Sequence, residues 1–272
     1  MKQIRIYFSI LFFVFIANSF LSQTANIIEG CSPLEVEFTA PGGITWFWDF
    51  DDGASSSLAD PIHTFTTGTY DVGYSESVSG PIIGTVTITI YDKIVPEYSA
   101  LTATQGCAPL AVTFEDDNTF TPSGVNITGY TWTSTGPAIS GSPVTFIYNN
   151  AGVYDLSMNV TTNMASCDTT VNFLDVVSVS TVSADFSIIP ASAGCNPPLT
   201  VNFNESSSTN NAPPLSYFWD FGNGNTSILQ NPTSQTYSSI GDFTIVLTTT
   251  DTNGCANSFS SDISVGSPTS SF

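Results

Sequence analysis

Apolar and polar residues alternate along much of the chain with a period of two. Phe243, Ile245 and Leu247 alternate with Thr or Val, and the same spacing recurs in residues 85–90 and 154–160. Such alternation predicts strands of antiparallel sheets with one buried face. No helical periodicity extends beyond a turn or two. The sequence therefore predicts an all-β fold.

These predicted strands belong to a pattern that occurs three times. Residues 48–53 read Trp-Asp-Phe-Asp-Asp-Gly and residues 219–224 read Trp-Asp-Phe-Gly-Asn-Gly, each followed by a Gly-x-Tyr or Gly-x-Phe strand. The second copy keeps its Trp and its Gly-x-Tyr, but residues 133–136, Thr-Ser-Thr-Gly, replace the acidic turn. We expect one set of core aromatic side chains in each repeat: Trp48, Phe50 and Tyr70; Trp132 and Tyr154; Trp219, Phe221 and Phe243.

Each repeat begins with a cysteine, a proline and an alternating strand, as in Cys31-Ser-Pro-Leu and Cys107-Ala-Pro-Leu. Together with the aromatic strands, this gives about seven strands per repeat, which is typical of an immunoglobulin-like β-sandwich. We predict three tandem sandwiches, in residues 23–92, 93–179 (degenerate) and 180–266. Residues 267–272 read as a linker.

The first 22 residues have the features of a secretory signal peptide. Lys2 and Arg5 precede the apolar run Ile6–Ile16, and small residues follow it. This segment is too short to be a membrane-spanning helix, and no later run is long and apolar enough to span. We therefore expect an exported protein, secreted or held at the cell surface.

The charge of the chain narrows the class of partner. It contains 23 Asp and Glu residues against 3 Lys and Arg, a formal net charge of −20. Nucleic acid is excluded as a partner, since almost no positive charge is present to neutralise phosphates. The acidic residues can simply keep the protein soluble. The more specific alternative is that some of them bind a divalent cation.

The repeated motifs resemble those of PKD (polycystic kidney disease) domains. The resemblance rests on the Trp-Asp-Phe-Gly-x-Gly turn, the Asp60-Pro61 and Asn231-Pro232 steps and the Gly-x-Tyr strand, and it is strongest in repeats one and three. Such domains occur in exported surface proteins of gliding bacteria and alongside secreted proteases and chitinases. The resemblance implies a non-catalytic module for spacing, adhesion or protein contact.

The five cysteines are consistent with disulfides in an exported protein. Within a sandwich, the cysteine before the Pro-Leu strand and the cysteine after the Gly-x-Tyr strand lie at opposite ends, too far apart for a disulfide. In a head-to-tail array, Cys31 reaches Cys167 and Cys107 reaches Cys255, which leaves Cys195 unpaired. We favour this cross-unit pairing. Pairing within units, Cys107 with Cys167 and Cys195 with Cys255, remains open.

Residues for catalysis are scarce. His63 is the single histidine, so neither a catalytic triad nor a His-rich zinc site can be assembled. No cofactor is indicated. Two acidic clusters have the hard oxygen ligands that calcium prefers, although turns are commonly acidic. The candidate calcium ligands are Asp49, Asp51 and Asp52 in the first cluster, and Glu115, Asp116 and Asp117 in the second.

If Trp48 and Trp219 point inward, their neighbours Phe47 and Phe218 point outward. Exposed aromatic rings of this kind can stack on a sugar or on another protein. The alternative is that a loop or a neighbouring repeat covers them.

The main hypothesis is a non-enzymatic extracellular array, an adhesion or spacer module that contacts a protein or polysaccharide. The alternative is the accessory, substrate-binding region of an exported protease or glycoside hydrolase whose catalytic domain lies outside this chain. A stand-alone carbohydrate-binding protein is a third reading. Sequence beyond Phe272 discriminates the first two.

Overall fold

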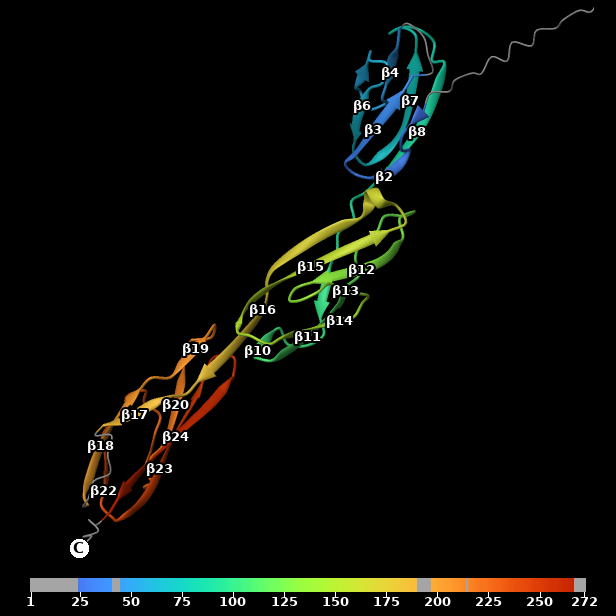
Figure 1. Cartoon of the computed structure of the whole chain (residues 1–272). Coiled ribbons are helices and arrows are strands. Elements are labelled where there is room, and N and C mark those ends of the chain that lie inside the picture. Colours follow the sequence, from blue (N-terminus) through green and yellow to red (C-terminus); the bar gives the residue numbers. More distant parts are fainter. Residues whose placement is uncertain (1–23, 41–44, 190–196, 214, 267–272) are drawn as a thin grey trace, which may run out of the picture. The chain divides into compact units, whose positions relative to one another are not determined.

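A computed structural model of the chain confirms the predicted all-β fold (Figure 1). It describes residues 24–40, 45–189, 197–213 and 215–266. Contacts divide the chain into two units, Met1–Lys93 and Ile94–Phe272. The first unit is one β-sandwich and the second contains two, here called sandwiches 1, 2 and 3. The predicted signal peptide, residues 1–22, lies outside the described residues.

Sandwich 1 consists of a three-stranded and a five-stranded sheet. The first has the order β1-β3-β6 and the second β2-β8-β7-β4-β5. All pairings are antiparallel except that of β2 with β8. The strands are β1 (Thr24–Ala25), β2 (Glu29–Cys31), β3 (Leu34–Thr39), β4 (Phe47–Asp49), β5 (Ser55–Ser56), β6 (Ile62–Phe65), β7 (Gly68–Ser75) and β8 (Gly84–Tyr91).

Sandwich 2 repeats this arrangement, with sheets β9-β11-β14 and β10-β16-β15-β12-β13. The strands are β9 (Tyr98–Ala100), β10 (Gln105–Cys107), β11 (Leu110–Asp116), β12 (Ile127–Thr133), β13 (Ile139–Ser140), β14 (Val144–Tyr148), β15 (Gly152–Thr162) and β16 (Thr169–Ser183). A short 3-10 helix, Ala165–Cys167, lies between β15 and β16.

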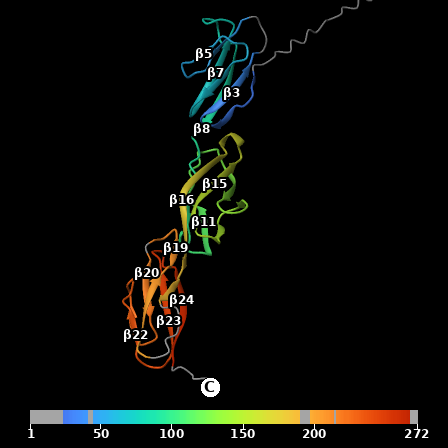
Figure 2. The same cartoon turned by 60° about the vertical axis from the view of Figure 1, so that its left-hand side comes forward.

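Sandwich 3 has the sheets β17-β18-β22 and β21-β20-β23-β24 (Figure 2). Its strands are β17 (Phe186–Ile189), β18 (Leu199–Glu205), β20 (Ser216–Asp220), β21 (Thr226–Ser227), β22 (Gln235–Tyr237), β23 (Gly241–Thr250) and β24 (Ala256–Val265). The remaining strand, β19 (Ser208–Asn210), pairs instead with β16.

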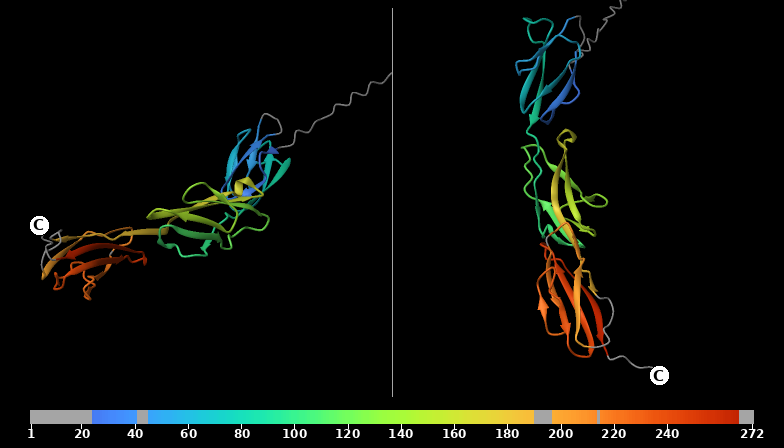
Figure 3. Two further views of the ribbon diagram at one scale, coloured as in Figure 1. Left: turned by 60° about the horizontal axis from the view of Figure 1, so that its bottom comes forward. Right: turned by 90° about the vertical axis from the view of Figure 1, so that its left-hand side faces the viewer.

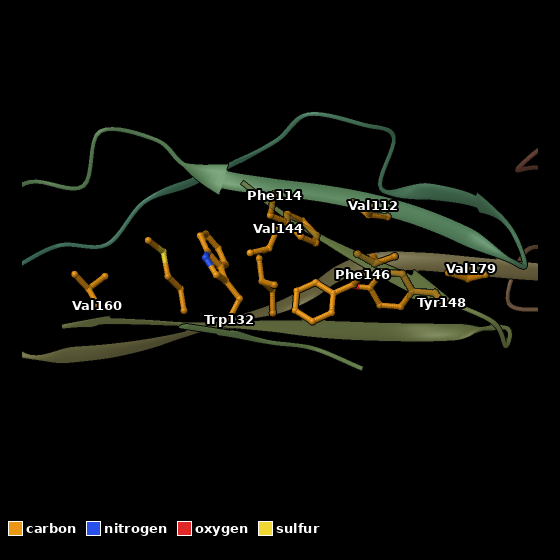
Figure 4. Close-up of a cluster of buried hydrophobic side chains, with 11 residues drawn as sticks. Val112, Phe114, Trp132, Val144, Phe146, Tyr148, Val160 and Val179 are labelled. Carbon is orange, nitrogen blue, oxygen red and sulfur yellow. The ribbon is translucent and has the colours of Figure 1, made fainter. Parts of the chain in front are cut away.

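Each sandwich has its own hydrophobic core, closed around one tryptophan. Trp48, Trp132 and Trp219 are completely buried. Each indole Nε1 donates a hydrogen bond to a loop carbonyl, on Leu58, Gly141 and Leu229 respectively, at 2.8–3.1 Å. The tryptophan thus ties a loop to the core in every repeat. Figure 4 shows Trp132 between the strands of sandwich 2 with Phe114, Phe146 and Tyr148.

The other predicted core residues divide into two groups. Phe50 and Phe221 are buried next to their tryptophans. Tyr70, Tyr154 and Phe243 are partly buried and pack against the same cores. In sandwich 2, Ser134 stands two positions after Trp132, where the other repeats have phenylalanine, and its hydroxyl lies 2.8 Å from that of Tyr148. A hydrogen bond therefore takes the place of aromatic packing in the degenerate repeat.

The Gly-x-Tyr motif has a steric origin. The Tyr70 hydroxyl donates to the carbonyl oxygen of Thr66, and the Tyr154 hydroxyl to that of Asn150, in each case four residues upstream. This is the tyrosine corner of immunoglobulin-like folds. The tyrosine ring folds back over the glycine, so that a Cβ at Gly68 would lie 3.0 Å from Cζ of Tyr70. Glycine is needed because the ring occupies the space of a side chain.

Along the strands, buried and exposed side chains alternate as the sequence pattern predicts. Figure 3 shows each sandwich from two further directions. One feature departs from the predicted boundaries. β16 runs from Thr169 to Ser183, through position 179, where the second domain was expected to end. Sandwiches 2 and 3 therefore share a continuous strand. Within the described ranges, no helix has the length and apolarity needed to cross a membrane.

Candidate functional site: the joint between sandwiches 2 and 3

The joint between sandwiches 2 and 3 combines a disulfide, a shared strand and a buried polar cluster. Cys107 ends β10, at the turn that precedes β11. Cys255 lies in the turn between β23 and β24 of sandwich 3. The two form a disulfide with a Cα–Cα distance of 5.4 Å. This is the cross-unit pairing favoured from the sequence, and it replaces the within-unit alternatives for both cysteines.

The shared strand forms the second connection across the joint. The last residues of β16 pair with β19, with Thr181 opposite Asn210 and Ser183 opposite Ser208. The earlier part of β16 pairs with β15 and, in parallel, with β10. A single strand is therefore hydrogen-bonded to the body of sandwich 2 and to an insertion of sandwich 3. Such a continuous ladder restricts hinge motion, because bending would break backbone hydrogen bonds.

Asn211, directly after β19, forms the third connection. Its φ of 74° is a left-handed conformation that asparagine tolerates better than most residues. The side-chain Nδ2 lies within 3.0–3.2 Å of the carbonyl oxygens of Gly152 and Val179 and of Ser178 Oγ. One amide group of sandwich 3 thus bonds two strands of sandwich 2.

A buried polar cluster fills the centre of the joint. Ser180 is completely buried, and its Oγ accepts a hydrogen bond from Asn253 Nδ2 at 3.1 Å. Asp251, which is 6% exposed, accepts the backbone N–H groups of Asn253 and Cys255 with Oδ1, each at 2.9 Å. The carboxylate therefore shapes the turn that presents Cys255 to Cys107. The other oxygen of this carboxylate, Oδ2, is buried without a hydrogen-bond partner.

Sequence reasoning did not identify β19, Asn211 or the Ser180 cluster. Residues 205–211 read as a polar loop, because Ser, Thr and Asn give no apolar alternation. Cys31 and Cys167 are also disulfide-bonded. Cys195, expected to be unpaired, lies outside the described residues.

The acidic turn of sandwich 1 uses its carboxylates to cap backbone groups. Asp49 Oδ1 accepts the N–H of Asp51, and Asp52 Oδ1 accepts the N–H of Ala54. Asp51 Oδ2 accepts the N–H of Asp71 at 3.0 Å. The corresponding turn in sandwich 3 has the same two hydrogen bonds. Asp220 Oδ1 accepts the N–H of Gly222, and Asn223 Oδ1 accepts the N–H of Asn225. The acidic residues are thus explained by the geometry of the turn.

His63, in β6, contacts this turn from the neighbouring strand. Its Nε2 lies 2.7 Å from Asp52 Oδ2, and its ring stacks on Phe50 with the centroids 4.1 Å apart. Burial opposes ionisation of Asp52, but the hydrogen bonds from His63 and Ala54 and the histidine charge prevail and lower the pKa of this carboxyl.

The second acidic cluster is dispersed by the strand that carries it. Glu115 and Asp116 are the last two residues of β11, so their side chains leave opposite faces. Glu115 accepts from Ser99, and Asp117 accepts from Asn118 Nδ2. Asp116 contacts Thr119 and Tyr130; burial together with the hydrogen bond and charge of Asp116 raises the pKa of Tyr130 to about 12.

Within the described ranges, no three His, Cys, Asp or Glu side chains converge in a way that could hold a metal ion. The two outward phenylalanines differ in exposure. Phe218 is 50% exposed on β20, whereas Phe47 is half-buried and lines a small pocket with Val78 and Ile82. Loop residues of sandwich 1 thus adjoin Phe47.

The chain is similar to a known protein family and to several solved structures. Residues 189–265 match the PKD domain family. Among solved structures, the PKD1 domain of the Vibrio cholerae metalloprotease PrtV is 30% identical, with 32% of this chain and 99% of that chain covered and a TM-score of 0.28. Three N-terminal domains of the bacteriophage RB49 outer capsid protein Hoc are 12% identical, with 90% and 98% covered and a TM-score of 0.41.

Extracellular domains 3–5 of Drosophila OTK are 9% identical, with 89% of this chain and 93% of that chain covered and a TM-score of 0.31. A comparison with curated protein sequences finds no significant match. The repeated sandwiches define the class of protein, a tandem array of immunoglobulin-like domains. The chain belongs to the PKD domain family, and its third sandwich carries the match.

Proposed function

We propose that this chain is a non-catalytic extracellular array that holds a partner-binding surface at a fixed distance and orientation from its attachment. The observation that carries this proposal is the joint of sandwiches 2 and 3, where the Cys107–Cys255 disulfide is combined with the strand shared by β16 and β19. A flexible linker would suffice to connect two independent modules. A covalent and hydrogen-bonded joint is needed when the orientation of one sandwich relative to the next has to be fixed.

We also propose that Cys31 pairs with Cys167. Both residues are disulfide-bonded. Cys31 corresponds to Cys107 in the repeat, since each ends a three-residue strand before a proline turn. Cys167 corresponds to Cys255, since each lies between the last two long strands of its sandwich. The same rule of connection would then apply at both joints of the array.

The acidic composition and the export signal complete the proposal. Disulfides are stable in the extracellular space. The partner is an extracellular protein or polysaccharide, and a net charge of −20 favours a basic or neutral one. The array acts without a resident cofactor.

Cell adhesion in the source organism tests the display function. One variant combines Cys107→Ser, Cys255→Ser and Asn211→Gly, which introduces a hinge while keeping all three cores. A second replaces residues 184–266 by a Gly/Ser linker of equal length. Antibody staining confirms equal surface exposure. We expect both variants to reduce adhesion or partner capture. Binding at the native level by both would contradict a role in spacing and orientation.

The alternative, an accessory region of an exported protease or glycoside hydrolase, makes a different prediction. In that case the joint variants would leave adhesion unchanged and would lower hydrolysis of an insoluble substrate by the full-length protein. Sequencing the gene beyond the codon for Phe272 identifies which assay applies.

A further inference from the structure

Sandwich 1 has a small pocket on the outer face of its larger sheet. Phe47 and Asp49 flank the inward Trp48, so both side chains point away from the core. The loop between β7 and β8 folds over this face. The pocket has a volume of about 150 Å³ and is lined chiefly by Phe47, Asp49, Gly73, Ser75, Val78 and Ile82.

Gly73 lets the loop side chain of Ile82 lie close to the sheet beside this pocket. It stands opposite Asp49 in the β4–β7 pairing, and a Cβ at this position would lie 3.2 Å from Ile82 Cδ1. Ile82 therefore lies over bare backbone. Sandwich 3 has the same aromatic and acidic residues, Phe218 and Asp220, but Val246 stands opposite Asp220. The Val246 side chain thus occupies, in sandwich 3, the space that Ile82 occupies above Gly73 in sandwich 1.

The chemistry of the pocket is that of a receptor for one basic side chain. The side chains of Phe47, Val78 and Ile82 supply apolar contacts in a lining that is otherwise polar, and Val78 and Ile82 are 77% and 62% exposed to solvent. Asp49 supplies an exposed carboxylate beside these side chains. Lysine and arginine place their methylene groups on apolar surface and keep the charged end in water. Pockets for small-molecule ligands commonly measure about 300–1,000 Å³, so this one suits a single side chain.

The charge of the whole chain favours the same occupant. With 23 acidic and 3 basic residues, its field attracts cationic partners and repels a second copy of itself. We infer that the pocket under the β7–β8 loop receives a lysine or arginine side chain of an extracellular partner protein. The inference rests on the proposed display function, because the pocket would be the surface displayed. It names the chemistry of the partner.

NMR titration of the ¹⁵N-labelled mature chain tests the pocket directly. The probe is the blocked tripeptide acetyl-Gly-Lys-Gly-amide, and its control is the norleucine analogue, which has the same apolar stem without the charge. We expect the lysine peptide to shift the amide signals of Gly73, Ser75 and Val78 with a saturable, millimolar affinity, and the norleucine peptide to bind at least about threefold more weakly.

Three variants separate the pocket from general attraction to an acidic protein. Asp49→Asn keeps the Oδ1 that caps Asp51, and Gly73→Val installs the residue of sandwich 3 against the mobile end of Ile82. We expect the first to weaken lysine-peptide binding at least about threefold and the second to abolish it. Asp220→Asn, the matched change in sandwich 3, should leave binding unchanged.

Three results would overturn the inference: equal shifts with the norleucine peptide, an equal effect of Asp49→Asn and Asp220→Asn, or no saturable shift near Gly73. None of them bears on the adhesion of the hinge variant, which tests the display function separately. Correct folding of Gly73→Val is checked by the unchanged amide signals of the sandwich 1 core.

Discussion

Asn211 of sandwich 3 donates a hydrogen bond from Nδ2 to the carbonyl oxygen of Gly152 in sandwich 2, at a distance of 3.0 Å. Gly152 is the first residue of the Gly-x-Tyr strand β15, so the contact ties the tyrosine corner of one sandwich to the insertion of the next. The joint therefore uses a residue whose sequence context gives no sign of a structural role.

Asn211→Gly should loosen this joint without unfolding either sandwich. Glycine accepts the φ of 74° and removes only the side-chain hydrogen bonds, each of which contributes about 0.5–1.5 kcal/mol. When the disulfide of the Asn211→Gly variant is reduced, we expect NMR residual dipolar couplings to give different alignment tensors for sandwiches 2 and 3, because the two then move independently. Asn118→Gly is the control, since Asn118 also has a positive φ of 56° but lies in a loop of sandwich 2. Indistinguishable tensors in both variants would show that Asn211 does not contribute to the joint.

Trp48→Ala should unfold sandwich 1 selectively. The indole is completely buried and tied to the carbonyl of Leu58, so truncation costs about 3–5 kcal/mol. In differential scanning calorimetry we expect one transition to fall by more than about 10 °C while the others stay in place. Ile62→Ala, at a side chain that is 58% exposed, should shift the same transition by only a degree or two.

Acid should weaken sandwich 1 through Asp52. The pKa of Asp52 is lower in the folded state than in the unfolded chain, so the ionised carboxylate favours the fold. This contribution is fully present above the unfolded-state pKa of about 3.9 and is lost as the pH falls through the folded-state value. We expect the unfolding temperature of sandwich 1 to fall more between about pH 6 and about pH 3 in the native protein than in the Asp52→Asn variant.

Sandwich 3 offers an internal reference for this measurement. There Gln235 stands at the position of His63, and its Oε1 accepts a hydrogen bond from Asn225 Nδ2 at 2.9 Å, so no carboxylate is involved. The Asp52→Asn change should therefore leave the transition of sandwich 3 unaltered at every pH. An identical pH dependence of sandwich 1 in the native and Asp52→Asn proteins would remove the His63–Asp52 contact from the account.

Calcium should not stabilise the protein. Asp49, Asp51 and Asp52 already accept backbone N–H groups, and Glu115 and Asp116 leave opposite faces of β11. Calcium ordinarily takes six to eight oxygen ligands, which these positions do not gather. We expect the unfolding temperatures to be equal in millimolar calcium and in chelator. A rise that Asp51→Asn abolishes would restore the acidic turn as a metal site.

The fold was predictable because each repeat gives the same local signals. Trp48 and Trp219 stand at inward positions of alternating strands, and the proline turns mark where the next strands begin. The head-to-tail logic also led to the pairing of Cys107 with Cys255, since strand length alone separates the two ends of a sandwich.

The remaining features depend on contacts between distant segments. β19 is a short polar strand that forms only against Thr181–Ser183 of β16, so no periodicity within residues 208–210 reveals it. The domain boundary expected at position 179 fell inside β16 for the same reason. Gly73 likewise reads as an interruption of an alternating strand, and its meaning emerges only when Ile82 is placed above it.

The central claim is that a disulfide joins the first turn of sandwich 2 to the last turn of sandwich 3. Peptide mapping of the unreduced, exported protein by mass spectrometry tests it most directly. The account predicts one linked peptide pair containing Cys107 and Cys255 and a second containing Cys31 and Cys167. Linkage of Cys107 to Cys167, or free thiols at Cys107 and Cys255, would contradict it.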